Sequence, residues 1–305
     1  MPNPLVPSIS GNQVSLSALL DNPARLNALI AKLAADMLIV DAFFRPSGTA
    51  VTGGSLLYDV LLSGGNYPTR DVQERSPGAE YIITTGDVTR DLATPQDWGA
   101  KVQILDEERV RFDQVVISNR LIQLANGIAR KIDQIAIAAV ELALSKYSIA
   151  GVSGHDWGSL ITVGPLDQIT PNNGRPSADI ANAALLARAD DTGVKPPDTL
   201  VCHPQQLTAL RIGYGSELND VLASVGITDI RTSMQVTVGT AYVVASGAAG
   251  VLAFEPSPFG VNGSGLVTEV IPDRQARSTW IQSYAVPVFA VPVPGAIRKI
   301  TGLAG

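Results

Sequence analysis

The chain of 305 residues holds one cysteine and two histidines, the side chains best suited to chemistry near neutral pH. Cys202 and His203 are adjacent in "TLVCHPQ", which suggests a thiol–imidazole pair for nucleophilic catalysis. The segment is typical of a short strand, however, and neighbouring side chains on a strand point to opposite faces. We therefore expect Cys202 to be buried and His203 to lie near the surface, and a soluble Cys/His hydrolase is only a distant alternative.

His155 and Asp156 form a second candidate pair, in the glycine-rich stretch "GVSGHDWG". An Asp–His pair there could orient a general base or a metal ligand. Neither an HExxH motif nor an acid-rich calcium loop accompanies it, and a single cysteine excludes an internal disulfide and a cysteine-based zinc site. We expect an ordinary solvated histidine and no metal.

Glycine motifs and carboxylate pairs add no catalytic signature. "GYGSEL" at 213–218 lacks the third glycine of a dinucleotide fingerprint, and no P-loop occurs. "GVNGSGL" does not match the nucleophile motif GxSxG. Asp106 and Glu107 precede a helical pattern, where acids interact with the helix dipole. The sequence therefore predicts no catalytic residue, no cofactor and no enzyme.

The densest run of charge lies at residues 70–91, "RDVQERSPGAEYIITTGDVTRD". It holds three arginines and five acids but no lysine or histidine. Such a run suits a disordered loop, a nucleic-acid contact, or an arm that reaches a neighbouring copy of the chain. The net charge of −6 and the scattered lysines argue against a phosphate-binding surface.

Composition points to burial between subunits rather than in a membrane. Charged residues make up 16% of the chain, against roughly 25% in typical soluble domains, which leaves much neutral surface. Two charge-free runs are long enough to test as membrane spans. Residues 232–254 predict two strands joined in a hairpin through "SGAAG", and residues 278–297 contain prolines that a spanning helix tolerates poorly. The start of the chain has no targeting segment.

Proline and glycine spacing divides the first third of the chain. Residues 1–15 read as an extended arm, 21–37 as a helix and 38–46 as a strand. Residues 52–105 predict a long two-stranded excursion, in which "SLLYDVLL" leaves and "WGAKVQILDEE" returns. A two-stranded ribbon is marginal alone in water, so other structure must cover its apolar residues. These are Leu57, Tyr58, Val60, Ile82, Ile83, Val102 and Ile104.

The rest of the chain predicts a long helix and then alternating elements. Residues 106–147 have apolar residues at three- and four-residue steps and no proline; a continuous helix of this length would be about 60 Å long. In residues 151–270, Ser177 precedes the helix "ADIANAALLARA", "TLVCH" is a strand, and Pro204 opens another helix. The tail reads as strands whose prolines favour an edge position.

This order of parts resembles the major capsid proteins of tailed bacteriophages, whose Hong Kong 97-type fold is shared with encapsulin shells. The likeness rests on the succession of segments over nearly the whole chain, because no single motif is specific. The segments are "DVQERSPGAEY", "WGAKVQILDEERVRFD", "NRLIQLANGIARKID", "PDTLVCHPQQLTALR", "GTAYVVASGAAGVLAFE" and "VPVFAVPVPGAIRKITG".

The resemblance implies an α+β fold of five segments. They are an N-terminal arm (1–45), an extended two-stranded loop (46–105), the spine helix of a peripheral domain (106–149), an axial domain (150–270), and C-terminal strands that complete the peripheral domain (271–305).

The resemblance also implies a function: self-assembly into an icosahedral shell around the double-stranded DNA of a tailed phage. Expected partners are many copies of the chain itself in pentamers and hexamers, a separate scaffolding protein, a portal and optional decoration proteins. The packaged DNA would be a non-specific neighbour, with no membrane involved. The protein would reside in the virion capsid after assembly in the host cytoplasm. An encapsulin-like compartment around a cargo enzyme is the alternative.

The charged run then becomes the tip and return strand of a loop that lies across an adjacent subunit. Candidate contact residues are Arg70, Asp71, Glu74, Arg75 and Glu80, with Trp98 at the base of the loop; ordinary solvated or packing roles are the alternative for each.

Two further expectations follow from comparison with that family. Some members cross-link their shells through a loop lysine, but no lysine occurs between Lys32 and Lys101. Arginine cannot replace that nucleophile because it stays charged. We therefore expect a shell without covalent cross-links. The chain opens with Met1 directly at the arm, which favours a separate scaffolding protein over proteolytic trimming.

Overall fold

The computed structural model describes residues 9–10, 13–14, 39–48, 51, 53–68, 70–86, 89–110, 114–256 and 265–303. The predicted helix at 21–37 and most of the predicted arm lie outside these residues.

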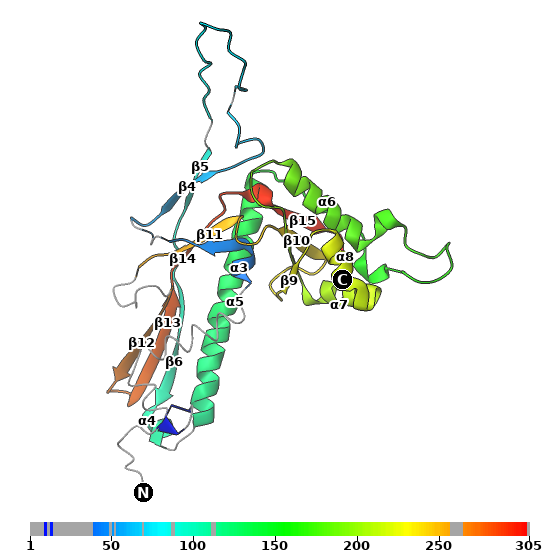
Figure 1. Ribbon diagram of the computed structural model, residues 1–305. Coiled ribbons are helices and arrows are strands. Elements are labelled where there is room, and N and C mark those ends of the chain that lie inside the picture. The colour runs from blue at the N-terminus through cyan, green and yellow to red at the C-terminus, as the bar shows by residue number, and fades with distance from the viewer. Residues whose placement is uncertain are drawn as a thin grey trace.

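The molecule is elongated and built around one long helix, α5 (Gln114–Lys146) (Figure 1). Its 33 residues span about 50 Å at 1.5 Å per residue. An apolar stripe that includes Leu121, Leu124 and Ile128 is buried along it, as the three- and four-residue spacing predicts. The predicted helix begins earlier as α4 (Asp106–Val110), and residues 111–113 between the two helices lie outside the description.

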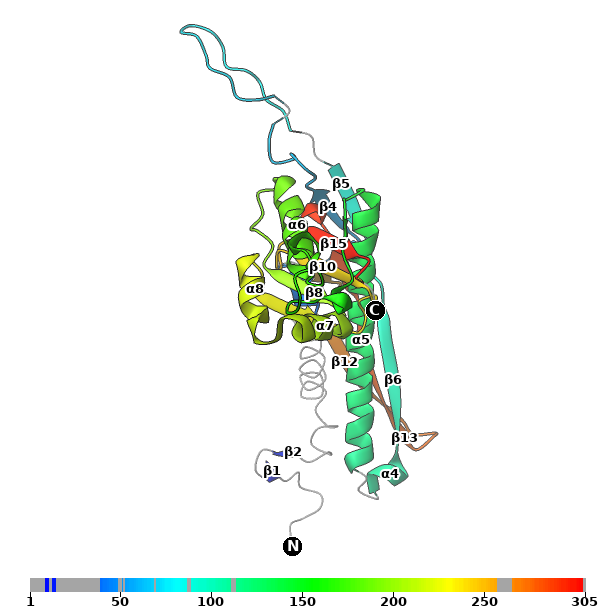
Figure 2. The ribbon, with the colours of Figure 1, turned by 90° about the vertical axis from the view of Figure 1, so that its right-hand side faces the viewer.

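A three-stranded antiparallel sheet runs alongside α5, in the order β12-β13-β6 (Figures 1 and 2). Ile104 of β6 and Ile281 of β13 are at most 1% exposed and belong to the same core as α5. The strands are β12 (Leu266–Asp273), β13 (Ser278–Ala285) and β6 (Trp98–Leu105).

A five-stranded sheet with three helices forms a second body beside α5 (Figure 1). Its order is β7-β15-β10-β8-β9, and all five residues of β10 are buried. The elements are β7 (Val152–Ser153), β15 (Ile297–Thr301), β10 (Thr240–Val244), β8 (Thr199–Cys202), β9 (Asp229–Thr232), α6 (Pro176–Ala189), α7 (Pro204–Tyr214) and α8 (Leu218–Ser224).

Two small sheets lie toward the C-terminal end of α5 (Figure 1). One sheet has the order β14-β11-β3, and β4 pairs with β5 in another. The bounds are α3 (Val40–Phe43), β3 (Phe44–Pro46), β4 (Leu56–Val60), β5 (Thr89–Ala93), β11 (Gly250–Phe254) and β14 (Pro287–Ala290).

The remaining elements are short. β1 (Ile9–Ser10) pairs with β2 (Gln13–Val14) in an antiparallel sheet of their own. Single 3₁₀ turns are η1 (Trp157–Ser159), η2 (Asn172–Gly174), η3 (Gly215–Glu217) and η4 (Pro294–Ala296).

Several local predictions are confirmed. The strand before Cys202 is β8, and Pro204 is the first residue of α7, with His203 as its N-cap. Cys202 is fully buried and His203 is half-buried. Prolines lie in edge strands: Pro287 in β14 and Pro272 in β12. The helix expected after Ser177 begins at Pro176 as α6.

The predicted hairpin at 232–254 is wrong, although both strands exist. β10 pairs with β8 and β15, whereas β11 pairs with β14 and β3. A strand buried throughout, as β10 is, needs a partner on each edge, and segments distant in sequence supply both. The turn around residues 245–249 therefore carries the chain from one sheet to another.

The predicted strand at 38–46 is also wrong in its first half. α3 forms one helical turn before β3, so that Phe43 and Phe44 are both buried. Successive residues of a strand would face opposite sides. Phe43 instead packs edge-on to Tyr242 (5.8 Å between ring centroids) and Phe44 to Phe289 (4.9 Å).

The two-stranded excursion is built differently from the prediction. The partner of β4 is β5, while β6, expected as the return strand, pairs with β13 over eight residues. The tail is likewise divided: β13 and β14 lie beside α5, but β15 inserts between β7 and β10 in the second body.

One carboxyl lies inside the core where the N-terminal segment meets α5. Asp133 is 4% exposed and accepts a hydrogen bond from the backbone N–H of Ile39 (3.1 Å). Burial raises the pKa of Asp133 to about 6 and the charge of Asp41 adds to the rise, while hydrogen bonds from Ile39 and Ser233 oppose it.

Replacing Asp133 with asparagine should flatten the dependence of stability on pH. Because the ordinary pKa is 3.8, the folded chain holds this proton between pH 4 and 6 while the unfolded chain has released it. The free energy of unfolding of the wild type therefore falls as pH rises through that window. The amide of Asp133→Asn still offers an oxygen to the N–H of Ile39. The free energy of unfolding of this variant, relative to that of the wild type, should therefore rise by about 2–3 kcal/mol between pH 4 and 7.

Urea unfolding of the unassembled chain at a series of pH values measures this difference. Asp97→Asn, at an exposed carboxyl, is the matched control. Parallel pH profiles for wild type and Asp133→Asn would contradict the assignment.

Candidate functional site: the projecting loop and its anchors

The chain between β4 and β5 projects far beyond the rest of the molecule (Figures 1 and 2). Its described residues, 61–68 and 70–86, contain no strand or helix, so the predicted return strand is not found among them. The tip turns at Pro77 and Gly78, where Ala79 N–H donates to Ser76 O (3.1 Å). Gly78 has φ +87°, as the third position of a type II turn requires.

Apolar side chains on this loop have no core of their own chain to enter. Val72 and Ile83 are each 83% exposed and Tyr81 is 75% exposed. By contrast, Val60 at the start of the loop is buried, as is Ile104 in β6. The expectation that the excursion lacks a local core is therefore wrong for its base and correct for its outer part.

The five predicted contact residues of the loop are all exposed. Among the described residues, Arg75 makes a contact with another side chain. Arg75 donates to Ala79 O (3.0 Å) and its guanidinium lies over the ring of Tyr81 (4.6 Å to the centroid), which stiffens the tip. Asp71 accepts from the N–H of Val72. No ion pair joins Arg70, Glu74 or Glu80 to another residue in the described ranges.

Trp98, the sixth predicted residue, is half-buried at the start of β6. Its indole N–H donates to Gln96 Oε1 (3.3 Å), and Lys131 Nζ of α5 lies 4.2 Å from the ring centroid. Among the described residues, its indole therefore interacts with Gln96 just before β6 and with Lys131 of α5.

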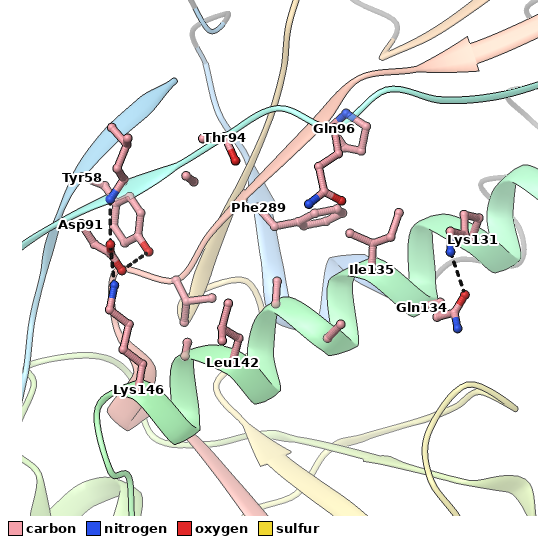
Figure 3. Close-up of a pocket in the computed structure, with 17 residues that line it drawn as sticks. Tyr58, Asp91, Thr94, Gln96, Lys131, Gln134, Ile135, Leu142, Lys146 and Phe289 are labelled. Atoms are coloured by element: carbon pink, nitrogen blue, oxygen red, sulfur yellow. Dashed lines mark hydrogen bonds and ion pairs between the residues drawn. The ribbon is translucent and has the colours of Figure 1, made fainter. Parts of the chain in front are cut away.

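A first anchor fixes the loop to the end of α5 through Asp91 of β5 (Figure 3). Asp91 stands opposite Tyr58 of β4 in the strand register and accepts its hydroxyl (3.1 Å). It also accepts from Tyr147 Oη (2.7 Å) and Lys146 Nζ (2.7 Å). One carboxylate therefore ties both strands of the loop base to the spine helix.

This anchor is charged at neutral pH. Burial of the Asp91 carboxyl opposes ionisation, but hydrogen bonds from Lys146 and Tyr147 outweigh it and hold the pKa of Asp91 well below its usual range. Burial and the Asp91 charge raise the pKa of Tyr58 and of Tyr147 to about 12. Both phenols therefore remain hydrogen-bond donors.

A second anchor holds the first limb of the loop at the end of α6. Gly64 N–H donates to Asp190 O (3.2 Å) and Tyr67 Oη donates to the Asp191 carboxylate (2.6 Å), which raises the pKa of Tyr67. Asp191 has φ +46°, where glycine is favoured. Asp190 in turn pairs with Arg298 of β15, so this anchor connects the loop to the five-stranded sheet.

A groove of about 470 Å³ lies under the first anchor, between β5, β14 and α5 (Figure 3). Leu142 of α5, 69% exposed, and Phe289 of β14 are among its apolar lining, with Lys131 and Lys146 toward its two ends. The groove thus presents apolar side chains beside the base of the loop.

The histidine pair predicted from sequence has a different partner. Asp179 of α6, 1% exposed, accepts from the ring of His155 (2.8 Å), from its backbone N–H (2.9 Å) and from the indole of Trp157 (3.0 Å). Asp156 instead accepts from Gly158 N–H. The expectation of an ordinary solvated histidine is therefore wrong, because His155 holds its loop against α6.

Cys202 has no reactive character, because burial raises the pKa of its thiol to about 12. Within the described part of the chain, no group of three or more His, Cys, Asp or Glu side chains could hold a metal ion. None of the helices that the structure describes is long and apolar enough to cross a membrane.

Sequence reasoning missed both anchors. Asp91 was visible only as one acid of the charged run, and Tyr147 is 56 residues away from it. The one local signal was the "ADDTG" turn after the α6 pattern, since two acids before a glycine suit a helix end with left-handed backbone.

Removing the charge of Asp91 should loosen the loop base. Asp91→Asn loses the ammonium–carboxylate attraction and part of the hydrogen bonding with two phenols, so we expect a loss of about 1–3 kcal/mol in the free energy of unfolding. Hydrogen exchange should also quicken in β4 and β5. Asp59→Asn is the control, because its pair with Arg90 is 67% and 69% exposed and should change stability by less than about 0.5 kcal/mol. Equal effects of the two substitutions would argue against an anchor.

A sequence profile described as phage capsid protein matches residues 89–300, which is more than half of the chain. No curated protein matches the sequence. Three solved structures share the fold with low identity. They are the virus-like particle from Pyrococcus furiosus (TM-score 0.57, 12% identity, covering 90% of this chain and 97% of that chain), the capsid of Myoviridae phage XM1 (0.57, 14%, 86% and 90%) and the capsid of cyanophage P-SCSP1u (0.58, 12%, 88% and 89%).

The fold is thus the α+β, Hong Kong 97-type capsid fold that the sequence predicts. With a profile match over residues 89–300, this chain belongs to the phage capsid protein family.

Proposed function

We propose that copies of this capsid protein close into an icosahedral shell around the double-stranded DNA of a tailed phage, with the loop of each copy lying across an adjacent copy. One observation carries the proposal: Val72, Tyr81 and Ile83 are at least 75% exposed on a loop that projects away from its own chain. Apolar side chains gathered on such a projection favour contact with another protein.

The loop is suited to docking because its base and tip are ordered before any contact forms. Asp91 and Asp191 hold the two limbs, and Arg75 stiffens the tip. Preorganisation lowers the entropic cost of association. On an adjacent copy, Arg70, Asp71, Glu74 and Glu80 would pair with complementary charges and set the register, and Trp98 would lie at the edge of the contact.

Assembly in pentamers and hexamers multiplies these contacts, so that weak individual interfaces add to a stable shell. A separate scaffolding protein, a portal and decoration proteins are further proposed partners, with assembly in the host cytoplasm. The net charge of −6 suits a wall that does not adhere to packaged DNA. An encapsulin-like compartment is the alternative, and extraction of purified particles distinguishes them by releasing DNA or a cargo protein.

Substitutions at the loop tip should impair assembly without unfolding the chain. Ile83→Ser removes an apolar contact worth about 1–3 kcal/mol per copy, and Arg75→Glu reverses a charge that also holds the turn. Both should lower the yield of particles in sedimentation velocity and negative-stain microscopy, while thermal unfolding of the unassembled chain changes little.

The matched controls lie away from the loop. Leu185→Ser changes an apolar side chain of α6 that is 64% exposed, and Arg274→Glu reverses an exposed charge in the turn after β12. Wild-type yield from both loop variants would refute the proposed role of the loop.

The shell should contain no covalent cross-links between copies. The described part of the loop holds arginine but no lysine, and arginine is not a nucleophile at accessible pH. Purified particles boiled in detergent should run as a single band near 31.9 kDa. A ladder of multiples under reducing conditions would show that this expectation is wrong.

A further inference from the structure

A second projection lies on the body that contains the five-stranded sheet, on the side away from α5 (Figure 1). It is formed by residues 160–170, between η1 and η2. Its neck is closed by two hydrogen bonds, from Thr170 N–H to Ile161 O (3.0 Å) and from Ile161 N–H to Thr170 Oγ1 (3.0 Å). Its turn is closed at Pro165, whose carbonyl accepts from Gln168 and Ile169. Hydrogen bonds therefore restrain the backbone of this loop at its neck and at its turn.

The tip of this loop is apolar and almost fully exposed. Leu166 is 94% exposed and Val163 is 88% exposed, while Asp167 is the only charged residue between 160 and 170. An ordered loop that holds two aliphatic side chains in solvent is a surface prepared for a protein contact.

An apolar groove of about 340 Å³ lies at the base of the same loop. Trp157 and Leu160 line one side, and Ala209 and Ile212 of α7 line the other. Ile212 is 81% exposed. A cavity of about 150 Å³ can hold a benzene molecule, so this groove has room for two aliphatic side chains.

The neck of the loop packs beside its own groove, and the tip points away from it. Leu160 packs closely on Gly213, where a Cβ atom would come within 2.5 Å of Leu160 Cδ2, and Thr162 Oγ1 donates to Gly213 O (3.2 Å). These contacts fix the neck beside α7, and the closed neck directs the tip outward, as the exposure of Leu166 shows. The tip of the same loop therefore leaves this groove open.

We propose that Val163 and Leu166 of one copy insert into the Trp157–Ile212 groove of an adjacent copy. This inference rests on the proposed function, because it assumes that copies are neighbours in a shell. A second copy is the occupant that the chain itself supports, because every copy brings one largely apolar tip and one largely apolar groove. Asp167 beside the tip also has the opposite charge to Arg211, an exposed residue of α7 that precedes the groove residue Ile212. Because tip and groove are different surfaces, the contact is heterologous and repeats around a ring.

Cysteine cross-linking in assembled particles tests the contact directly. Leu166→Cys and Thr208→Cys place thiols on the tip and in the groove lining, and the native Cys202 is fully buried. With a mild thiol oxidant, the double variant should give a ladder of covalent multimers up to the size of the ring. Co-assembled single variants should give mixed dimers only, whereas each single variant alone should stay monomeric.

Two outcomes overturn the proposal. Particles that assemble normally but form no tip-to-groove cross-link would remove the contact while leaving the shell-forming function intact. Cross-links of Leu166→Cys with itself would indicate that tips meet tips. Absence of particles from wild-type protein would instead count against the proposed function.

A dissociation measurement supports the test without a covalent bond. Leu166→Ser should weaken the contact about tenfold per copy, judged from the burial of one leucine side chain, and should lower the urea concentration at which particles dissociate. Leu185→Ser, an equally conservative change outside tip and groove, should not. Circular dichroism of both unassembled variants checks that the fold is kept, and equal dissociation of the two would contradict the inference.

Discussion

The packing of α5 against both sheets is the interaction on which the rest of the structure depends. Along one part of its length the helix buries its stripe against Ile104 and Ile281. At Glu141 it is joined to the second body, because this carboxylate accepts from Tyr242 of β10 and from Lys299 of β15. A 33-residue helix needs such neighbours, since isolated helices are marginal in water. The helix thereby connects the three-stranded sheet beside it to the five-stranded sheet of the second body.

The loop between β4 and β5 is held in its direction by contacts with α5 and with the second body. Asp91 connects it to Lys146 and Tyr147, at and just beyond the last turn of the helix, while Asp190 and Asp191 connect it to α6 and β15. Movement of α5 relative to the five-stranded sheet would therefore be transmitted to the loop through both anchors. This matters for the proposed function, because the loop is where we propose that adjacent copies meet.

Local structure was largely predictable from the sequence, because its causes are local. Pro204 begins α7, and the apolar spacing of α5 is explicit in the residues themselves. Strand pairing was not, because the partners come from distant segments: β15 lies beside β10, and β3 runs parallel to β11. The sequence indicates which segments form strands, but it does not show which strands will be neighbours in a sheet.

The candidate site divides in the same way. The charged run at 70–91 is visible in the composition, and its place on a projecting loop followed from the resemblance to capsid proteins. The residues that hold the loop followed from neither. Tyr67 and Asp191 are 124 residues apart, and neither is unusual in its local sequence. A polar contact of this kind becomes visible only when tertiary structure brings both groups to the same place.

Polar anchors and apolar tips act at different stages of assembly. Asp91, with its side chain 17% exposed, keeps its partners without any neighbouring copy, because hydrogen bonds to a charged group are directional and survive partial exposure to water. Val72 and Ile83 on the loop, like Leu166 on the second projection, gain nothing until another surface removes water from them. A single chain can thus bury its own core and still leave the apolar side chains of its projections for its neighbours. An apolar base with polar tips would reverse this order, because the projections would collapse onto their own chain and the tips would have little to gain from docking.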